Sequence, residues 1–382
     1  MAGVYIHIPY CSQACHYCNF HFSTQLKSSA QMLEAMCLEI EMRKNELPHP
    51  LKTIYFGGGT PSILAVEQLQ QVIEAIKNHF GIEVLQEITL ECNPEDITAT
   101  KLNDWKALGI NRLSIGIQSF FDKDLKLMNR IHSGKQALES LDLAMGYFEN
   151  ISVDLIYGIP NQSDAEWKQN ITTITDRKIP HISAYALTVE PNTALDRFIA
   201  KEIIPAVSDA QAEADFFELI ERLSIDGYEH YETSNFAKPG FYSVNNTAYW
   251  TGASYLGIGP SAHSFDGEVR SWNSRNNHKY INAINQGVLP IEREQLSLRD
   301  KYNEYVMTAL RTKWGISLDQ ISTRFGQHFN DYLQKMAQNH IEEGLLSYDQ
   351  EMKTLSVSSK GKFLVDGLAS DLFLIELQSS NS

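Results

Sequence analysis

From Val4 to about Tyr231, short β-rich runs alternate with longer amphipathic runs along the chain. Alternation of this kind is typical of a parallel sheet whose strands are joined by helices. The pattern predicts strands over residues 4–8, 53–56, 87–91, 112–117, 151–156, 182–187 and 227–231. These strand and helix units are too few for a complete eightfold barrel. We therefore predict an α/β fold with a partial (β/α) barrel.

One unit of this pattern can be followed residue by residue. Leu102, Trp105 and Leu108 recur at helical spacing, which places them on one face of a helix. Gly109 follows directly, and glycine is the usual residue just past a helix end. The next predicted strand begins within three residues, so the helix and strand form one short repeat.

Residues 236–290 differ from what precedes them, because they are rich in Asn, Gly, Ser and aromatic residues and show little periodicity. A segment of this length is too long for an ordinary connection, and its aromatic content argues against disorder. We expect it to pack over the barrel.

After Leu296 the pattern becomes helical again, with helices near 299–313, 317–324 and 328–343 and a hairpin through 346–357. Three helices and a hairpin resemble a winged-helix unit. The predicted organisation is therefore a barrel over 1–235, the aromatic segment over 236–290, a winged-helix-like helical domain over 291–376, and a tail at 377–382.

Composition narrows the classes of function. The 382 residues include 32 Lys and Arg against 47 Asp and Glu, a net charge of −15. An acidic chain repels phosphate backbones, so nucleic acid is not an expected partner. The first residues lack a signal peptide pattern and no apolar run approaches 18 residues, so we expect a cytoplasmic protein without an integral membrane segment.

Three of the five cysteines lie within eight residues, at Cys11, Cys15 and Cys18, just after the first predicted strand. Three thiolates can hold a four-iron cluster and leave one iron without a protein ligand. The amino and carboxylate groups of S-adenosylmethionine can bind that open iron. A structural zinc site that recruits His16 or His21 is the alternative, although zinc ligands usually come in two pairs.

Further candidates follow the predicted strands. Glycines 57–59 could bring backbone N–H groups close to a ligand, or could form a plain tight turn. Glu91, Gln118 and Asp154 stand at the carboxyl ends of apolar strands, where a parallel barrel opens its binding mouth. Each of the three could instead bond only to a neighbouring loop.

Together these motifs resemble the radical S-adenosylmethionine (radical SAM) superfamily, and within it the oxygen-independent coproporphyrinogen III oxidase-like family. The resemblance covers nearly the whole chain. It is carried by the cysteine loop and by Tyr-Ile-His-Ile-Pro (5–9), Gly-Gly-Gly-Thr-Pro (57–61), Asn-Arg-Leu-Ser-Ile-Gly-Ile-Gln-Ser (111–119) and Asp-Leu-Ile-Tyr-Gly-Ile-Pro (154–160).

The resemblance implies a partial barrel of the radical SAM type, a [4Fe-4S] cluster on the three cysteines, and bound S-adenosylmethionine. Arg130 resembles an arginine that binds the cofactor carboxylate or balances charge; otherwise it is a solvated helix charge. The implied cofactor contacts are Tyr5, Tyr17, Gly58, Gly59, Thr60, Glu91, Gln118, Arg130 and Asp154.

Phe20 distinguishes two branches of this family. The oxidases carry a further cysteine at that position, whereas the heme-chaperone branch does not. The resemblance therefore favours a protein that binds heme and delivers it to apo-proteins such as respiratory enzymes. A radical SAM enzyme acting on a porphyrinogen, in porphyrin biosynthesis, is the alternative, and whether S-adenosylmethionine is cleaved stays open.

One position departs from the heme-chaperone pattern. The branch usually has His-Asn-x-x-Tyr-Trp where this chain has Asn245 in place of the histidine. A carboxamide is a poor heme ligand, so that contact does not carry over. His263 or His230 could serve instead, although a lone histidine is more often a packed, hydrogen-bonded residue. Tyr249 and Trp250 could stack on a porphyrin or belong to the core.

Overall fold

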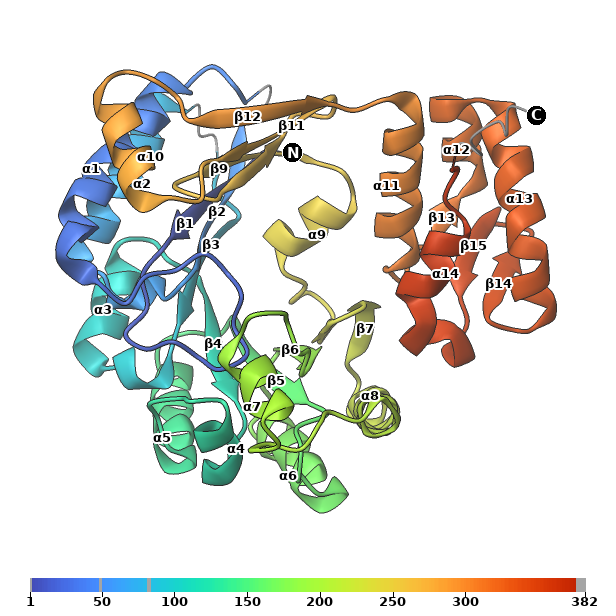
Figure 1. Cartoon of the computed structure of the whole chain (residues 1–382), viewed down its shortest axis with the longest axis horizontal. Helices are drawn as coiled ribbons and strands as arrows, with labels where there is room; N and C mark the ends of the chain where they lie inside the picture. The colour runs from blue at the N-terminus through green and yellow to red at the C-terminus, as the bar shows by residue number, and fades with distance from the viewer. Residues whose placement is uncertain (1, 48–49, 81–83, 376–382) are drawn as a thin grey trace. The chain divides into compact units, whose positions relative to one another are not determined.

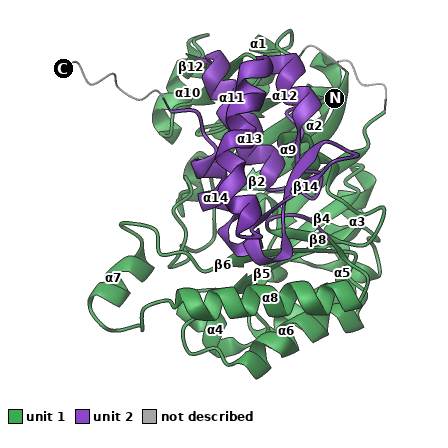
Figure 2. Ribbon diagram, turned by 90° about the vertical axis from the view of Figure 1, so that its right-hand side faces the viewer, with its two compact units in different colours: residues 1–229, 234–249, 253–294 green, residues 230–233, 250–252, 295–382 purple. Residues whose placement is uncertain are grey.

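The computed structural model describes residues 2–47, 50–80 and 84–375. Contacts divide the chain into two compact units, which Figure 2 colours separately. Unit 1 comprises Met1–Glu229, Ser234–Tyr249 and Ala253–Glu294, and unit 2 comprises His230–Thr233, Trp250–Gly252 and Gln295–Ser382. The tail expected at 377–382 lies outside the described residues.

Unit 1 is built around a parallel sheet whose first six strands lie side by side in chain order (Figure 1). They occupy the first six ranges that the apolar pattern predicted. Their central members are buried on both faces, and every residue of β4 is buried, as expected for a sheet covered by helices. The strands are β1 (Ala2–Ile8), β2 (Leu51–Gly58), β3 (Glu87–Cys92), β4 (Arg112–Gln118), β5 (Ile151–Tyr157) and β6 (His181–Ala186).

Helices connect these strands, and several of them begin after a Ser or Thr residue whose side chain accepts a hydrogen bond from the first helical turn. The Thr98 side chain accepts a hydrogen bond from Lys101 N at the start of α3, where Leu102 and Trp105 are fully buried, as the helical spacing predicted. Gly109 ends the unit with a φ of +89°. The helices are α1 (Ser29–Met42), α2 (Val66–His79), α3 (Ala99–Ala107), α4 (Asp122–Leu127), α5 (Gly134–Met145), α6 (Asp164–Asp176), α7 (Ala194–Ala200) and α8 (Asp209–Ile225). Among the described residues, no helix is both long and apolar enough to cross a bilayer.

The segment 236–290 contains regular elements that its weak periodicity did not reveal. β9 pairs in parallel with β1, and β10 and β11 continue the sheet in antiparallel fashion, so the segment extends the sheet beyond β1. Short strands separated by turns carry little periodic signal, which is why the sequence showed them as irregular. The elements are β8 (Asn235–Ala237), α9 (Val244–Trp250), β9 (Ser254–Ile258), β10 (His263–Phe265), β11 (Val269–Asn273) and α10 (Asn277–Asn285), followed by β12 (Ile291–Gln295).

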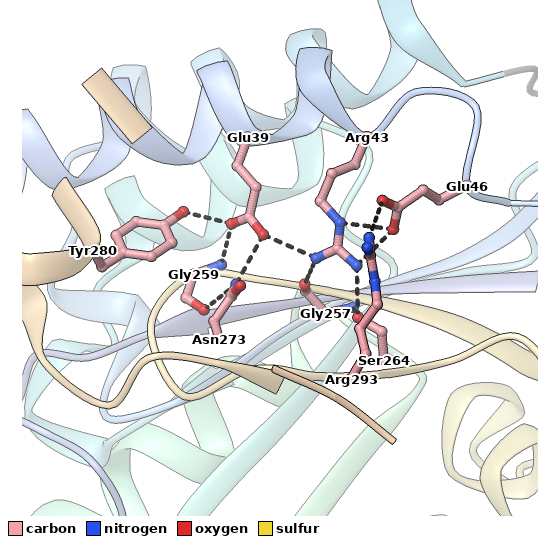
Figure 3. Close-up of polar contacts among 9 residues, drawn as sticks. All are labelled: Glu39, Arg43, Glu46, Gly257, Gly259, Ser264, Asn273, Tyr280 and Arg293. Carbon is pink, nitrogen blue, oxygen red and sulfur yellow. Dashed lines mark hydrogen bonds and ion pairs between the residues drawn. The ribbon is translucent and has the colours of Figure 1, made fainter. Parts of the chain in front are cut away.

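A buried carboxylate links the strands added beyond β1 to helix α1 through hydrogen bonds (Figure 3). Glu39 of α1 is fully buried, and its two oxygens accept hydrogen bonds from Gly259 N (2.9 Å), Asn273 Nδ2 (2.8 Å), Tyr280 Oη (2.5 Å) and Arg43 Nη1 (2.9 Å). Four donors from α1, α10 and the β9–β11 region therefore meet at one carboxylate, which offsets its loss of hydration.

Arg43 continues the same network. Its guanidinium, 2% exposed, donates to Gly257 O (2.9 Å) and Ser264 Oγ (3.1 Å), and pairs with Glu46 at 2.7 Å. The added strands are thus held to α1 by charged and polar contacts as well as by apolar packing.

Unit 2 consists of helices around a small antiparallel sheet of order β13-β15-β14, and matches the helices and hairpin predicted from the sequence. Its core gathers aromatic and aliphatic side chains such as Tyr302, Phe325, Phe329 and Leu333. The elements are α11 (Leu298–Leu310), β13 (Ile316–Ser317), α12 (Leu318–Phe325), α13 (Gln327–Glu342), β14 (Leu346–Asp349), β15 (Thr354–Val357) and α14 (Val365–Asp371). The strand β7 (Glu229–Glu232) lies largely in this unit, where Lys313 N donates to Tyr231 O.

We predict that Glu39→Ala lowers the free energy of unfolding by about 3 kcal/mol, because it leaves Arg43 with less compensation in a buried site. Glu41→Ala is the matched control, since Glu41 is exposed on the same helix and should change stability by no more than about 0.5 kcal/mol. Chemical denaturation measures both. Equal losses in the two variants would contradict the role given to the network.

Candidate functional site

The cysteine loop leaves the carboxyl end of β1 and is anchored at several points along its length. Cys11 N donates to Ser23 O (3.1 Å), and His16 N donates to Met128 O (3.1 Å). Gln13 Nε2 donates to Asn129 O at 2.8 Å. Cys11, Cys15 and Cys18 are therefore presented by a fixed loop, and all three thiols are free and line one cavity.

The glycine run at the end of β2 packs directly against this loop. Gly59 N donates to Ile8 O (2.8 Å), and a Cβ at Gly59 would lie 2.4 Å from Tyr10 O. Gly58 has a φ of +106°, and its N–H donates to Glu91 Oε2 (3.1 Å). The N–H groups of Gly58 and Gly59 thus bond within the protein, and the glycines are needed for close backbone approach.

Two carboxyl groups lie at the base of the same cavity. Glu91 accepts a hydrogen bond from Tyr55 Oη (2.8 Å), and Ser114 Oγ donates to Asp154 (3.2 Å). Burial raises the pKa of Glu91 to about 7, and the neighbouring Asp154 contributes to the rise. Burial likewise raises the pKa of Asp154 to about 6. Near neutral pH, Glu91 therefore exists in both protonated and ionised forms and can donate or accept a hydrogen bond, whereas Asp154 is mainly ionised and accepts.

Arg130 brings a positive charge to the cysteine loop. Its Nη2 donates to Asn93 Oδ1 (2.6 Å) and Gly116 O (2.8 Å), and its Nη1 lies 3.5 Å from Cys15 Sγ. The arginine is therefore not a solvated helix charge. Its position suits a charge-balancing role beside a thiolate, which was one of the two roles implied by the sequence.

The structure brings together almost all of the residues singled out from the sequence. Gln118 lines the cavity with a φ of +69°, an unfavourable conformation for a residue other than glycine, such as is often found at binding sites. Tyr5 does not line the cavity; its hydroxyl bonds to His7 Nδ1 at 3.3 Å and its ring stacks on Tyr55. The predicted residues that do line the cavity are Cys11, Cys15, Tyr17, Cys18, Gly58, Gly59, Thr60, Glu91, Gln118, Arg130 and Asp154.

Sequence reasoning missed the residues that hold these groups in place. Asn93 bonds to Arg130 and, through Nδ2, to Thr60 Oγ1 at 3.3 Å. It stands just after β3, so the rule that singled out Glu91 could have found it. Tyr55 lies within β2, where an aromatic residue in a buried strand gives no functional signal.

The donor set fits an iron-sulfur cluster. In a four-iron cube each thiolate binds a different iron atom, so the three sulfurs need not converge on one point. Within residues 2–47, 50–80 and 84–375, no group of three or more His, Cys, Asp or Glu side chains is arranged to hold a single metal ion. That arrangement does not favour the zinc alternative with His16 or His21. His16 Nδ1 already bonds to Leu127 O at 2.8 Å, and His21 Nε2 bonds to Asn277 at 2.7 Å.

Comparison with known proteins identifies the family. Residues 5–174 match the Radical SAM superfamily, and residues 296–364 match the HemN C-terminal domain. A heme chaperone HemW from Lactococcus lactis is 32% identical over 96% of this chain and 98% of its own length. A heme chaperone HemW from Bacillus subtilis is 32% identical over 95% of this chain and 97% of its own length. The chain belongs to the HemW family of the radical SAM superfamily.

A solved structure supports the fold of this HemW family member independently. The coproporphyrinogen III oxidase HemN from Escherichia coli superposes with a TM-score of 0.85 over 97% of this chain and 90% of its own, at 24% sequence identity. The prediction of a partial radical SAM barrel followed by a helical domain is confirmed. Membership of the superfamily implies a [4Fe-4S] cluster and S-adenosylmethionine as cofactors.

The raised pKa of Glu91 leads to a prediction for the cluster-free protein. Between pH 4.5 and 7 the folded state binds the Glu91 proton more tightly than the unfolded state, so the free energy of unfolding falls as pH rises. Relative to Glu91→Gln, the wild type should lose up to roughly 3 kcal/mol across this range. Chemical denaturation at several pH values measures the difference. A difference that does not change with pH would show that Glu91 titrates normally.

Proposed function

We propose that this protein holds a [4Fe-4S] cluster on Cys11, Cys15 and Cys18, binds S-adenosylmethionine against the open iron, and binds heme for delivery to apo-proteins. The observation that carries the proposal is the single cavity in which three free thiols meet Glu91, Asp154 and other strand-end polar groups. Full-length similarity to proteins named heme chaperones supports the delivery role.

In this proposal, different cavity residues contact different parts of S-adenosylmethionine. Thr60 and the glycines beside it contact the methionyl part, and Glu91, Gln118 and Asp154 contact its amino-acid or ribose groups. Arg130 balances the charge of the Cys15 thiolate, and Tyr17, which belongs to the loop, contacts the cofactor from the cavity wall. Tyr5 lies behind the cavity wall and acts indirectly, through its hydrogen bond to His7 and the stacking of its ring on Tyr55. When bound, the cluster supplies one-electron chemistry to the sulfonium.

Phe20 favours heme delivery over the oxidase reaction. It stands where the oxidases have a further cysteine, and its side chain is 70% exposed at the rim of the cavity. An exposed phenylalanine cannot ligate iron, but it offers apolar surface next to the cofactor. Heme-requiring apo-proteins, such as respiratory enzymes, are the proposed recipients. Because reduced thiols are retained in reducing compartments, we also propose a cytoplasmic location.

Replacing all three loop cysteines by alanine should abolish iron binding, the brown colour and S-adenosylmethionine affinity together, because the other cysteine that lines the cavity, Cys92, is a single buried residue of β3 and cannot replace three cluster ligands. Cys37→Ala is the control; Cys37 is a free cysteine of α1 outside the cavity and should leave all three properties unchanged. Iron and sulfide analysis after anaerobic reconstitution measures iron binding, and equilibrium dialysis measures the affinity for S-adenosylmethionine. Iron retained by the triple variant would refute the cluster assignment.

Adding hemin to the anaerobically reconstituted protein should produce a shifted Soret band that saturates near one heme per chain, followed by transfer to an added apo-heme protein. With coproporphyrinogen III and a reductant, no decarboxylated product should form. Absorbance titration and product chromatography measure these outcomes. Decarboxylated product formed together with 5′-deoxyadenosine would instead establish the oxidase reaction.

A further inference from the structure

The two histidines considered as heme ligands have very different surroundings. His230 in unit 2 is enclosed, with Nε2 bonded to Thr233 O at 3.1 Å and Nδ1 to Lys362 Nζ at 3.2 Å. His263 is exposed at the start of β10, and among the described residues its imidazole makes no hydrogen bond. Only His263 has ring nitrogens ready to bind a metal without breaking existing bonds.

Strand register places His263 within an aromatic surface. His263 pairs with Trp272, their ring centroids 6.0 Å apart, and Phe265 pairs with both Arg270 and Tyr255 across the neighbouring strands. Paired residues on adjacent strands project from the same face of a sheet. We call the five residues His263, Phe265, Trp272, Tyr255 and Arg270 the β9–β11 face.

The opposite side of the same strands is already occupied. Ser264 bonds to Arg43, and Asn273 bonds to Glu39, within the buried network of Figure 3. Because successive strand residues alternate between faces, the network fixes which residues the β9–β11 face exposes. His263 therefore points away from α1.

The β9–β11 face continues toward the cofactor cavity. β9 pairs in parallel with β1, with Gly257 opposite Tyr5, which places Tyr5 on the same side of the sheet as Tyr255. Tyr5 lies close enough to Glu91 for that carboxylate to raise the pKa of its hydroxyl, after the larger effect of burial. A flat ligand on this face would therefore lie beside the cavity that contains Glu91.

The charges around His263 suit a carboxylate-bearing ligand. Partial burial lowers the pKa of His263, and the nearby charges of Arg270 on β11 and of the exposed Arg275 lower it further. His7 lies near enough to His263 for the two to interact electrostatically, and the carboxylate of Glu292 accepts a hydrogen bond from Trp272 Nε1 at 3.2 Å. A neutral imidazole keeps its lone pair for iron, and arginines pair readily with carboxylates.

Asn245 is not available as a ligand, because it is buried and its side-chain oxygen and backbone N–H are bonded within the protein. It is 2% exposed, its Oδ1 accepts a hydrogen bond from Thr53 Oγ1 (3.0 Å), and its N–H donates to Glu87 Oε1 (3.1 Å). Thr53 and Glu87 stand near the amino ends of β2 and β3, whereas the cysteine loop follows the carboxyl end of β1. A side chain at position 245 is therefore buried at the other end of the strands.

We propose that His263 is the axial imidazole ligand of heme, with the porphyrin lying on the aromatic β9–β11 face and its carboxylates near Arg270 and Arg275. The inference rests on the proposed heme-binding function and adds to it the ligand and the surface. Aromatic rings provide flat apolar contact for a porphyrin, and a single histidine is a common protein ligand of heme iron.

The test compares hemin titrations of the reconstituted full-length protein with those of His263→Ala. We expect the variant to bind hemin at least ten-fold more weakly, to lose the imidazole-ligated absorbance and electron paramagnetic resonance signatures, and to regain them when free imidazole is added. His278→Ala is the matched control, because His278 is an exposed histidine on α10. Cluster content and melting temperature of each variant report on folding.

Two further variants test directly whether His263 is the heme ligand. His263→Tyr should give a phenolate-type ferric spectrum in place of the imidazole type, which no merely structural residue would do. Adding Asn245→His to His263→Ala should not restore binding. If the wild type binds no hemin, both the proposed function and this inference are wrong. Unchanged spectra in His263→Ala and His263→Tyr, or rescue by Asn245→His, would overturn the His263 assignment and leave the heme-binding function intact.

Discussion

The site depends on how closely the end of β2 approaches the start of the cysteine loop. Gly59 and Thr60 donate their N–H groups to the carbonyls of Ile8 and Tyr10, at 2.8 and 2.7 Å. Any side chain at position 59 would collide with the Tyr10 carbonyl, 2.4 Å from a Cβ placed there. Because this backbone contact sets the direction in which the loop leaves β1, it also determines where the three thiols stand above the parallel sheet.

Charge in the cavity is arranged around that loop. Arg130 is fixed by Asn93 and the Gly116 carbonyl, so its guanidinium stays beside Cys15 without depending on a bound cofactor. On the other side of the cavity, burial raises the pKa of Glu91 to about 7 and that of Asp154 to about 6. Positive charge therefore lies at the thiols, and groups that can exchange hydrogen bonds lie at the strand ends, which suits a ligand with a charged amino-acid part and a polar ribose.

The strands added beyond β1 serve two purposes, one on each face. One face meets α1 through the buried carboxylate and guanidinium of Glu39 and Arg43, and fixes the position of the extension. The other face carries aromatic side chains and an accessible imidazole at His263. A network that holds one face rigid makes the other a stable surface, because side chains on neighbouring strands keep their relative positions.

The sequence by itself determined the six parallel strands, the helices of the C-terminal unit and the cysteine loop, because apolar periodicity and ligand spacing are local properties of the chain. Strand-end polarity also found Glu91, Gln118 and Asp154. Tertiary structure alone decided the remainder. Contacts between residues far apart in the chain assign the glycine N–H groups to internal bonds, bring Asn93 to Arg130, and place Tyr5 behind the cavity. The strands β9 to β11 form because β1 offers an edge to pair with, and their register places His263 at an exposed position. Asn245 is buried because α9 packs it against Thr53 and Glu87.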